Sequence, residues 1–174
     1  VIGAGGVGSV AVHKMAMNPQ IFSDVHLASR TKSKCDAIAD SVKQRTGQTV
    51  STYATDAEDV PALTALIRQI GPKLVVNLAL PYQDLPIMDA CLETGVHYMD
   101  TANYEPRDEA KFTYKWQWPY HDKYKKAGIM AQSAMGFHPR QSNFYCASPH
   151  EFLFDEINQI DIVDCNDGSH GKAF

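Results

Sequence analysis

The 174-residue sequence lacks the features that mark several large classes of protein. No stretch approaches the roughly 18 consecutive apolar residues of a membrane-spanning helix, so we expect no membrane partner. Positive charge is not in excess, because 16 Lys and Arg face 20 Asp and Glu and the net charge is −4. This balance argues against nucleic acid as a partner. The sequence also has no internal repeat and no low-complexity segment.

Cysteine is scarce and dispersed. The sequence has no C-x-x-C pair and no tight cluster of Cys and His, which favours reduced thiols and a cytoplasmic location over a disulfide framework or a zinc site. His97 and Asp100 lie close in sequence but have no third ligand nearby, so we expect no metal site. The four cysteines are Cys35, Cys91, Cys146 and Cys165.

The sequence does contain a regular alternation of short apolar runs and helical segments. Strands are predicted at residues 1–2, 24–28, 49–54, 73–78, 96–100 and 129–134, and helices at 7–17, 31–45, 56–70, 85–94 and 119–127. Short loops join these elements, as in a parallel sheet with right-handed crossovers and helices on both faces. The fold class predicted is therefore α/β, with a Rossmann-type doubly wound parallel sheet.

The last part of the sequence departs from this rhythm. We predict a helix near residues 141–146 and a strand at 158–164, and we interpret that strand as the start of a second domain. The predicted division is a first, Rossmann-type domain over 1–148 and the beginning of a second, C-terminal domain over 149–174. The first residues look like the tail of a strand and the last lie in a polar loop, so we expect a piece of a longer protein.

The most specific local pattern is the glycine turn at the start. The run from Gly3 to Gly8 matches G-x-G-x-x-G between a strand and a helix. In such a turn Gly3 permits a tight bend, Gly5 lets the backbone approach a pyrophosphate, and Gly8 allows close packing of helix on strand. The alternative is a turn that only packs the helix. The residues predicted to bind the cofactor here are Gly3, Gly5, Gly6, Val7 and Gly8.

The end of the second predicted strand indicates which dinucleotide binds. An NAD site usually has Asp or Glu about 20 residues after the glycines, to bind the ribose hydroxyls. This sequence instead has Ser29, Arg30 and Thr31, which suit the 2′-phosphate of NADP or NADPH. The alternative is a solvated basic turn that caps the next helix.

Other polar residues follow the remaining strands, where ligands of open α/β sheets bind. Asp56 can accept a hydrogen bond from adenine or, equally, cap a helix. A polar cluster after the fifth strand lies where nicotinamide and substrate would meet. Further cofactor-binding residues are predicted at Asp56, Ala57, Asn77, Leu78, Ala79, Leu80, Pro81, Asp100 and Thr101, and substrate-binding residues at Tyr82, Asn103, Tyr104 and Phe137.

Aromatic residues are concentrated between the fifth and sixth predicted strands. We interpret this cluster as a packed loop or a subunit contact, with a ligand cage as the alternative. Its members are Phe112, Tyr114, Trp116, Trp118 and Tyr120.

Several stretches together resemble a known enzyme family. VIGAGGVG, ASRTKSKC, VVNLALPYQDLPIMDACLETGVHYMDTANYE and FDEINQIDIVDCNDGSHG are similar to the carboxynorspermidine synthase (carboxynorspermidine dehydrogenase) family, in the saccharopine dehydrogenase-like group. The resemblance covers essentially the whole chain, and the stretch from Asn77 to Glu105 is its most specific part.

The resemblance implies an NADPH-dependent oxidoreductase that acts on a CH–NH group in polyamine biosynthesis. Aspartate β-semialdehyde and a diamine, 1,3-diaminopropane or putrescine, would form an imine, and hydride from NADPH would reduce it to carboxynorspermidine or carboxyspermidine. The alternatives are a saccharopine reductase, with glutamate as the amine, and a non-catalytic NADP-binding sensor. The family also implies that residues 1–148 are an NADP-binding Rossmann domain and that residues 149–174 begin a larger α+β substrate domain, through which a homodimer forms.

The resemblance further places His170 near the substrate, where the family has an Asp-His pair and this sequence has Ser169 and His170. A departure lies after the sixth strand, where a family Gly-Phe-Asp-Pro-Gly turn is replaced by Gly-Phe-His-Pro-Arg at residues 136–140. The Asp becomes His138 and the Gly becomes Arg140, which changes the charge beside the expected active site. The sequence assigns no catalytic acid or base.

Overall fold

Five short strands form the framework of the fold. The computed structural model describes residues 1–109, 111, 113–136 and 141–163. Strands β1 and β2 pair in parallel, as do β3, β4 and β5. Their bounds are Val25–Ser29 for β1, Val50–Ala54 for β2, Leu74–Asn77 for β3, His97–Asp100 for β4 and Ala131–Gln132 for β5.

Ile2 joins these two groups of strands into one sheet. It bridges Ala28 of β1 on one side and Asn77 of β3 on the other, both in parallel. The Ile2 amide donates to the Val76 carbonyl at 2.9 Å, and the Leu78 amide donates to the Ile2 carbonyl at 2.8 Å. The order across the sheet is therefore β2, β1, Ile2, β3, β4, β5. The chain adds strands on one side of Ile2 first and then on the other, so Ile2 marks the topological switch point.

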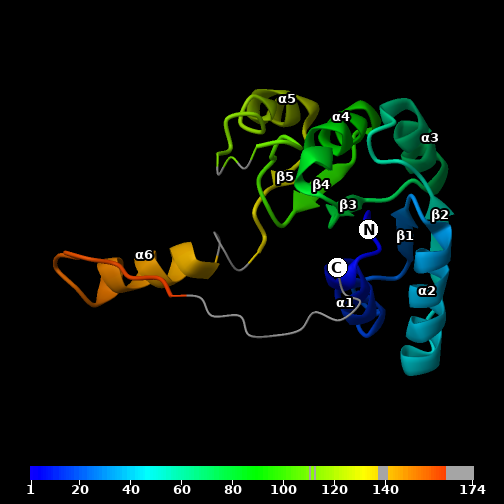
Figure 1. Cartoon of the computed structure of the whole chain (residues 1–174), viewed down its shortest axis with the longest axis horizontal. Coiled ribbons are helices and arrows are strands. Elements are labelled where there is room, and N and C mark those ends of the chain that lie inside the picture. Colours follow the sequence, from blue (N-terminus) through cyan, green and yellow to red (C-terminus); the bar gives the residue numbers. More distant parts are fainter. Residues whose placement is uncertain (110, 112, 137–140, 164–174) are drawn as a thin grey trace.

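Helices cover both faces of this sheet (Figure 1). Helices α1 and α2 pack on each other, while α3 and α5 flank α4. The bounds are Gly6–Ala16 for α1, Lys32–Thr46 for α2, Val60–Ile70 for α3, Asp84–Thr94 for α4 and Tyr120–Ala127 for α5, and a short 3₁₀ turn η1 spans Pro81–Gln83. The predicted Rossmann-type α/β fold is thereby confirmed, with element ends shifted by a few residues.

The core consists of two apolar clusters, one on each face. Val12 of α1, Leu27 of β1 and Val42 of α2 belong to one cluster and are fully buried. The other contains Ile87 of α4 and Tyr98 of β4, also fully buried. Two separate clusters are what a sheet covered on both faces requires, because each face must bury its own apolar side chains.

Helix α6, Ser142–Phe152, stands apart from this α/β body (Figure 1). It is longer than the predicted helix at 141–146, and the predicted domain boundary at 148 falls inside it. The strand predicted at 158–164 is wrong, since residues 158–163 form no strand and are exposed. A strand needs a neighbour to satisfy its backbone hydrogen bonds, and none lies beside these residues in the described part of the chain.

Candidate functional site

The glycine turn lies at the centre of the sheet, directly after Ile2. Gly3 has a φ of +109°, and a Cβ at this position would lie 2.4 Å from the carbonyl oxygen of Leu78. A Cβ on Gly8 would lie 2.0 Å from the carbonyl oxygen of Gly3. Both positions therefore exclude any side chain, because the contacts are with backbone atoms that cannot rotate away.

Helix α1 begins at Gly6 and presents its first turn at this edge of the sheet. Its N-cap, Gly5, offers no side-chain hydrogen bond, and the first turn carries no acidic residue. The first amide groups of a helix have no intrahelical partner and carry partial positive charge. A side-chain-free turn before such a helix end is a cradle that fits a pyrophosphate.

The residues after β1 are free to bind a further anion. Arg30 is exposed, and its guanidinium has no hydrogen-bond or ion-pair partner in the part of the chain that the structure describes. Thr31 is the N-cap residue of α2, yet its side chain makes no capping hydrogen bond. By contrast, the Lys32 ammonium group forms an ion pair with the Asp36 carboxylate at 2.7 Å and donates a hydrogen bond to the Thr52 hydroxyl at 3.0 Å. Arg30 and Thr31, next to Ser29, therefore remain available to a phosphate.

The residues after β2 make the turn into α3. Asp56 accepts a hydrogen bond from the Glu58 amide at 3.1 Å, which is a local turn. The cap of α3 is Asp59, which accepts from the Ala62 amide at 3.0 Å and which the sequence analysis missed. Ala57 is buried in the core, so only its backbone faces the sheet edge. The carboxylate of Asp56 retains room for a ligand.

The segment after β3 is held by a buried amide. Asn77 is 2% exposed and accepts a hydrogen bond from the Ala79 amide at 3.0 Å. Its side-chain nitrogen donates to Asp84 at 2.8 Å and to the Tyr98 hydroxyl at 3.1 Å. Asn77 thus positions the backbone of Leu78 and Ala79 beside the glycine turn. Leu80 is exposed, and Pro81 begins η1.

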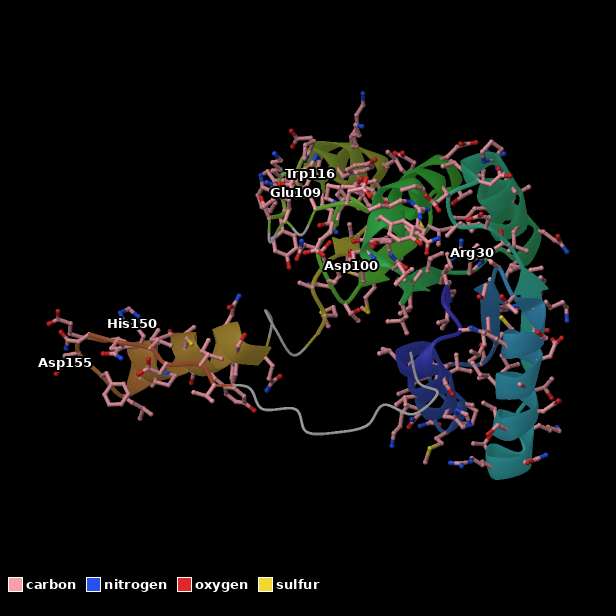
Figure 2. All side chains as sticks on the ribbon, in the orientation of Figure 1. Arg30, Asp100, Glu109, Trp116, His150 and Asp155 are labelled. Atoms are coloured by element: carbon pink, nitrogen blue, oxygen red, sulfur yellow. The ribbon has the colours of Figure 1, made fainter. Side chains whose placement is uncertain are left out.

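Asp100, at the end of β4, lies inside the protein (Figure 2). It is 1% exposed and accepts hydrogen bonds from the Ala134 amide at 2.7 Å, from Gln117 at 2.9 Å and from Ser133 at 3.3 Å. Ala134 has a positive φ of 60°, a conformation that costs energy for a residue with a Cβ. Asp100 therefore fixes the strand ends from within, and its neighbour Thr101 is half-buried at the surface.

Asp84 forms a buried pair of carboxylates with Asp100. Gln117 connects the two, with its side-chain nitrogen 3.5 Å from Asp84 and 2.9 Å from Asp100. Burial, followed by the negative charge of Asp100, raises the pKa of Asp84 to about 8, against the hydrogen bond from Asn77. Burial also raises the pKa of Asp100, but several hydrogen bonds oppose that rise. Ionising both carboxylates of this buried pair at once is therefore costly.

The residues predicted to contact substrate are partly engaged already. The guanidinium of Arg107 lies 3.8 Å from the centre of the Tyr82 ring and is also paired with Glu58. Asn103 donates to the backbone carbonyls of Tyr104 and Lys111 at 3.1 and 2.8 Å, which shapes the loop rather than a ligand site. The ring of Tyr104 packs edge-on against Trp116, with 5.4 Å between centres. Phe137 and His170 lie outside the described residues.

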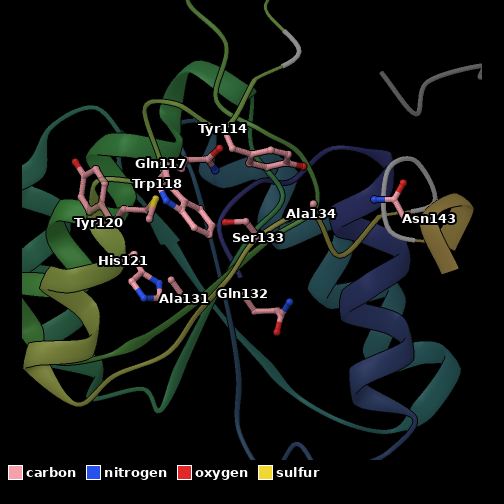
Figure 3. A pocket seen from close by; sticks show the side chains of 11 residues that line it. Tyr114, Gln117, Trp118, Tyr120, His121, Ala131, Gln132, Ser133, Ala134 and Asn143 are labelled. Carbon is pink, nitrogen blue, oxygen red and sulfur yellow. The ribbon is translucent and has the colours of Figure 1, made fainter. Parts of the chain in front are cut away.

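A cavity of about 460 Å³ lies between the end of β5 and the segment that leads into α5 (Figure 3). Trp118, Tyr114 and His121 form part of one wall, and Ser133 and Gln132 face them. Part of the predicted aromatic cluster therefore lines a cavity, while Trp116 packs on Tyr104 instead. Sequence reasoning identified the aromatic run but gave Gln117 and Asp84 no role.

Two further observations concern the described residues only. No group of three or more His, Cys, Asp or Glu side chains gathers in the described part of the chain to hold a metal ion. Among the described helices, none is both long and apolar enough to cross a membrane.

A glycine cradle at the switch point of a parallel sheet, followed by a free arginine after the next strand, defines a Rossmann-type dinucleotide-binding domain. Residues 1–131 match the family model described as the saccharopine dehydrogenase NADP binding domain, and the chain belongs to this family. That description agrees with the NADP or NADPH cofactor predicted from residues 29–31.

Curated relatives are similar along essentially the whole chain. This chain is 52% identical over 174 residues to carboxyaminopropylagmatine dehydrogenase of Synechocystis sp.. The alignment covers 100% of this chain and 43% of that protein. It is 39% identical over 182 residues to carboxynorspermidine synthase of Vibrio alginolyticus, covering 99% of this chain and 44% of that protein. The chain thus spans less than half the length of these relatives.

Solved structures support the fold. Apo saccharopine dehydrogenase (L-Glu forming) from Saccharomyces cerevisiae matches with a TM-score of 0.69 and 19% identity, over 86% of this chain and 29% of that one. A short-chain dehydrogenase from Sphingobium yanoikuyae in complex with NADPH matches with a TM-score of 0.54 and 14% identity, over 76% and 68% of the two chains. At these identities the likeness concerns the fold alone.

Proposed function

We propose that this chain is the NADPH-binding domain of a reductase that joins aspartate β-semialdehyde to an amine in polyamine biosynthesis. The observation that carries the proposal is the 52% identity, over the whole chain, to a carboxyaminopropylagmatine dehydrogenase. The relatives' two names share a carboxylated aminopropyl group joined to an amine, agmatine in one and a diamine in the other. The amine of this protein is then agmatine, 1,3-diaminopropane or putrescine.

The reaction would proceed in two balanced steps. The amine nitrogen attacks the aldehyde carbon and water leaves, which gives an imine. A hydride and a proton then add across the C=N bond, which gives a secondary amine and oxidised cofactor. The bound cofactor supplies the hydride, so the protein must orient the imine and keep it protonated.

The residues of this chain have distinct roles in that scheme. The glycine turn and the first turn of α1, with Gly3 and Gly8, hold the pyrophosphate, and Arg30 binds the 2′-phosphate with Ser29 and Thr31. The backbone from Asn77 to Pro81 borders the nicotinamide half of the cofactor. The buried carboxylates of Asp84 and Asp100, behind the strand ends, favour a cationic amine and a protonated imine.

The cellular setting is part of the proposal. Cys35, Cys91 and Cys146 are free thiols, which supports a reducing compartment such as the cytoplasm. We further propose that the intact protein is a homodimer, as the resemblance to its family implies. Size-exclusion chromatography with light scattering measures that state directly.

A steady-state assay of the intact protein tests the reaction. Aspartate β-semialdehyde is offered with agmatine, 1,3-diaminopropane, putrescine or glutamate, and NADPH oxidation is followed by absorbance. Oxidation that requires both the semialdehyde and one of the three polyamine-type amines is expected. Turnover with glutamate alone would assign a saccharopine-type reductase, and tight NADPH binding without any turnover would assign a sensor.

A matched pair of variants tests the cofactor site in the same preparation. Arg30→Ala should weaken NADPH binding by about tenfold or more, because a charged hydrogen bond to the 2′-phosphate is lost. NADH binding should change little, since NADH has no such phosphate. Lys32→Ala is the control, because Lys32 is already engaged by Asp36. NADPH binding is measured by calorimetry. If both variants weaken NADPH binding equally, Arg30 does not bind the 2′-phosphate specifically.

A further inference from the structure

The cavity beside β5 has a chemistry distinct from that of the cofactor cradle. It is lined by the Tyr114 and Trp118 side chains on one side and by the end of β5, with Ser133, on the other (Figure 3). Asn143 of α6 borders it as well. No Lys, Arg, Asp or Glu lines it in the described part of the chain, so the lining offers a carboxylate or phosphate no lysine or arginine to pair with.

A buried carboxylate lies directly behind this lining. Ser133 and Gln117 both line the cavity and both donate hydrogen bonds to Asp100, at 3.3 and 2.9 Å. Burial first, and then the charges of Asp100 and Asp84, raise the pKa of the Tyr114 hydroxyl. Carboxylate oxygens within one hydrogen bond of the lining therefore favour a cationic ligand over an anionic one.

One polar atom in the lining has no partner. The Tyr114 hydroxyl is buried and accepts or donates no hydrogen bond within the part of the chain that the structure describes. Leaving such a group unpaired costs free energy, and a ligand N–H group would remove that cost. Figure 3 shows this hydroxyl pointing along the cavity towards Ala134 and Asn143.

The cavity also offers a flat aromatic surface. The Trp118 ring stacks on His121, with 5.6 Å between centres and 16° between planes. Trp118 is nevertheless 71% exposed, so a large part of the indole surface remains open. A guanidinium ion is planar and weakly hydrated, and it stacks on indole better than a compact, strongly hydrated ammonium does.

We propose that this cavity binds the guanidinium end of the amine substrate, with Trp118 as the stacking surface and the Tyr114 hydroxyl as a hydrogen-bond acceptor. The inference rests on the proposed function, since it selects agmatine among the amines considered there. The amine end of agmatine would extend from the cavity past Ser133 to the carboxyl ends of the strands. Nothing in the cofactor site is required to change.

Binding of agmatine and putrescine to the NADP-loaded intact protein tests the proposal. The two ligands share a four-carbon chain and a primary amine and differ in the far end, guanidinium against ammonium. Agmatine should bind about tenfold more tightly, by calorimetry. Agmatine should also change the indole fluorescence of the protein, and this change should be smaller in Trp118→Leu. Equal affinity for the two ligands would overturn the proposal.

Two substitutions locate the binding. Trp118→Leu should weaken agmatine binding by about tenfold, because the stacking surface is lost. Tyr114→Phe, which removes one oxygen atom, should weaken it by about fivefold. Trp116→Phe is the control, since Trp116 packs on Tyr104 outside the cavity, and its agmatine affinity should match the unsubstituted protein. Unchanged affinity in both Trp118→Leu and Tyr114→Phe would place agmatine elsewhere.

Failure of this inference can be told apart from failure of the proposed function. If no amine supports NADPH oxidation, the proposed function is wrong, whatever the binding data show. If agmatine is turned over and its KM is unchanged in Tyr114→Phe and Trp118→Leu, the function holds and the cavity assignment is wrong. Competition between agmatine and NADPH would assign the cavity to the cofactor and would also overturn the inference.

Discussion

Asp84 is an acidic residue in a place where its charge is costly. It is 3% exposed and faces Asp100 through Gln117. Only one of two such carboxylates can be ionised at low cost, so the pair shares a proton. Asn77 then connects this pair to the backbone beside the glycine turn, through hydrogen bonds to Asp84 and from the Ala79 amide.

Asp84→Asn should stabilise the protein in a pH-dependent way. The pKa of Asp84 is raised from 3.8 to about 8 in the folded protein, so between these values the folded state holds a proton that the unfolded chain has released. The corresponding stability is present at low pH and is lost as the pH rises to about 8. An Asn cannot ionise, so the advantage of the variant should grow from pH 5 to pH 8 and then remain constant.

Thermal unfolding followed by circular dichroism at pH 5, 6, 7, 8 and 9 measures this difference. Asp122→Asn, on the exposed surface of α5, removes the same charge outside the buried pair and should show no such trend. A difference in Tm between Asp84→Asn and the unsubstituted protein that stays constant, or shrinks, from pH 5 to pH 8 would show that Asp84 is ionised in the fold.

At the scale of elements, the starts of α3 and α2 differ in whether the N-cap side chain forms a capping hydrogen bond. This difference separates a residue that stabilises the fold from one that is available for binding. Asp59 caps α3 through the Ala62 amide, whereas Thr31 stands at the start of α2 without a capping bond. Asp59→Ala should lower the free energy of unfolding by about 1 kcal/mol. Thr31→Ala should leave stability nearly unchanged and weaken NADPH binding. Urea unfolding and calorimetry check the two effects, and a stability loss in Thr31→Ala would contradict the assignment.

Elements that depend on local signals were predictable from the sequence. Gly47 ends α2 in a left-handed conformation, and Asn18 and Pro19 follow the end of α1, so these helix ends are encoded nearby. The absence of a strand at residues 158–163 was not predictable in this way. Their apolar alternation suits a strand, but pairing depends on a neighbour from elsewhere, and residues 158–163 have none beside them in the described chain.

The residues of the candidate site also differ in whether a local sequence pattern indicates them. Gly3, Gly8 and Arg30 act through their own backbone or charge, and the sequence alone indicated their positions. The pair of Asp84 and Asp100 depends on contacts across 16 positions of sequence and on burial, which no local pattern reports. Asp84 at the start of an apolar helix looks like an ordinary first-turn acid, and Asp100 looks like a ligand at a strand end.

At the scale of the molecule, Ile2 connects the two halves of the sheet. It is 6% exposed, and its backbone and that of Val1 accept hydrogen bonds from the Leu78 and Ala28 amides. Ile2→Ala should lower the free energy of unfolding by about 2–4 kcal/mol and speed hydrogen exchange at both amides. Ile38→Ala, in a half-buried position of α2, is the control. Exchange that rises at only one of the two amides would mean that the halves are not coupled through Ile2.

The central place of Ile2 also sets the order in which the nascent chain can assemble. The segment around Ile2 leaves the ribosome before both of its partners and becomes the middle strand, and its first partner, β1, follows within 30 residues. Its second partner, β3, begins at residue 74, so one edge of the middle strand stays open while α2, β2 and α3 are being made. An open strand edge invites pairing with other chains. Chaperone contact during synthesis should therefore be greatest before β3 emerges.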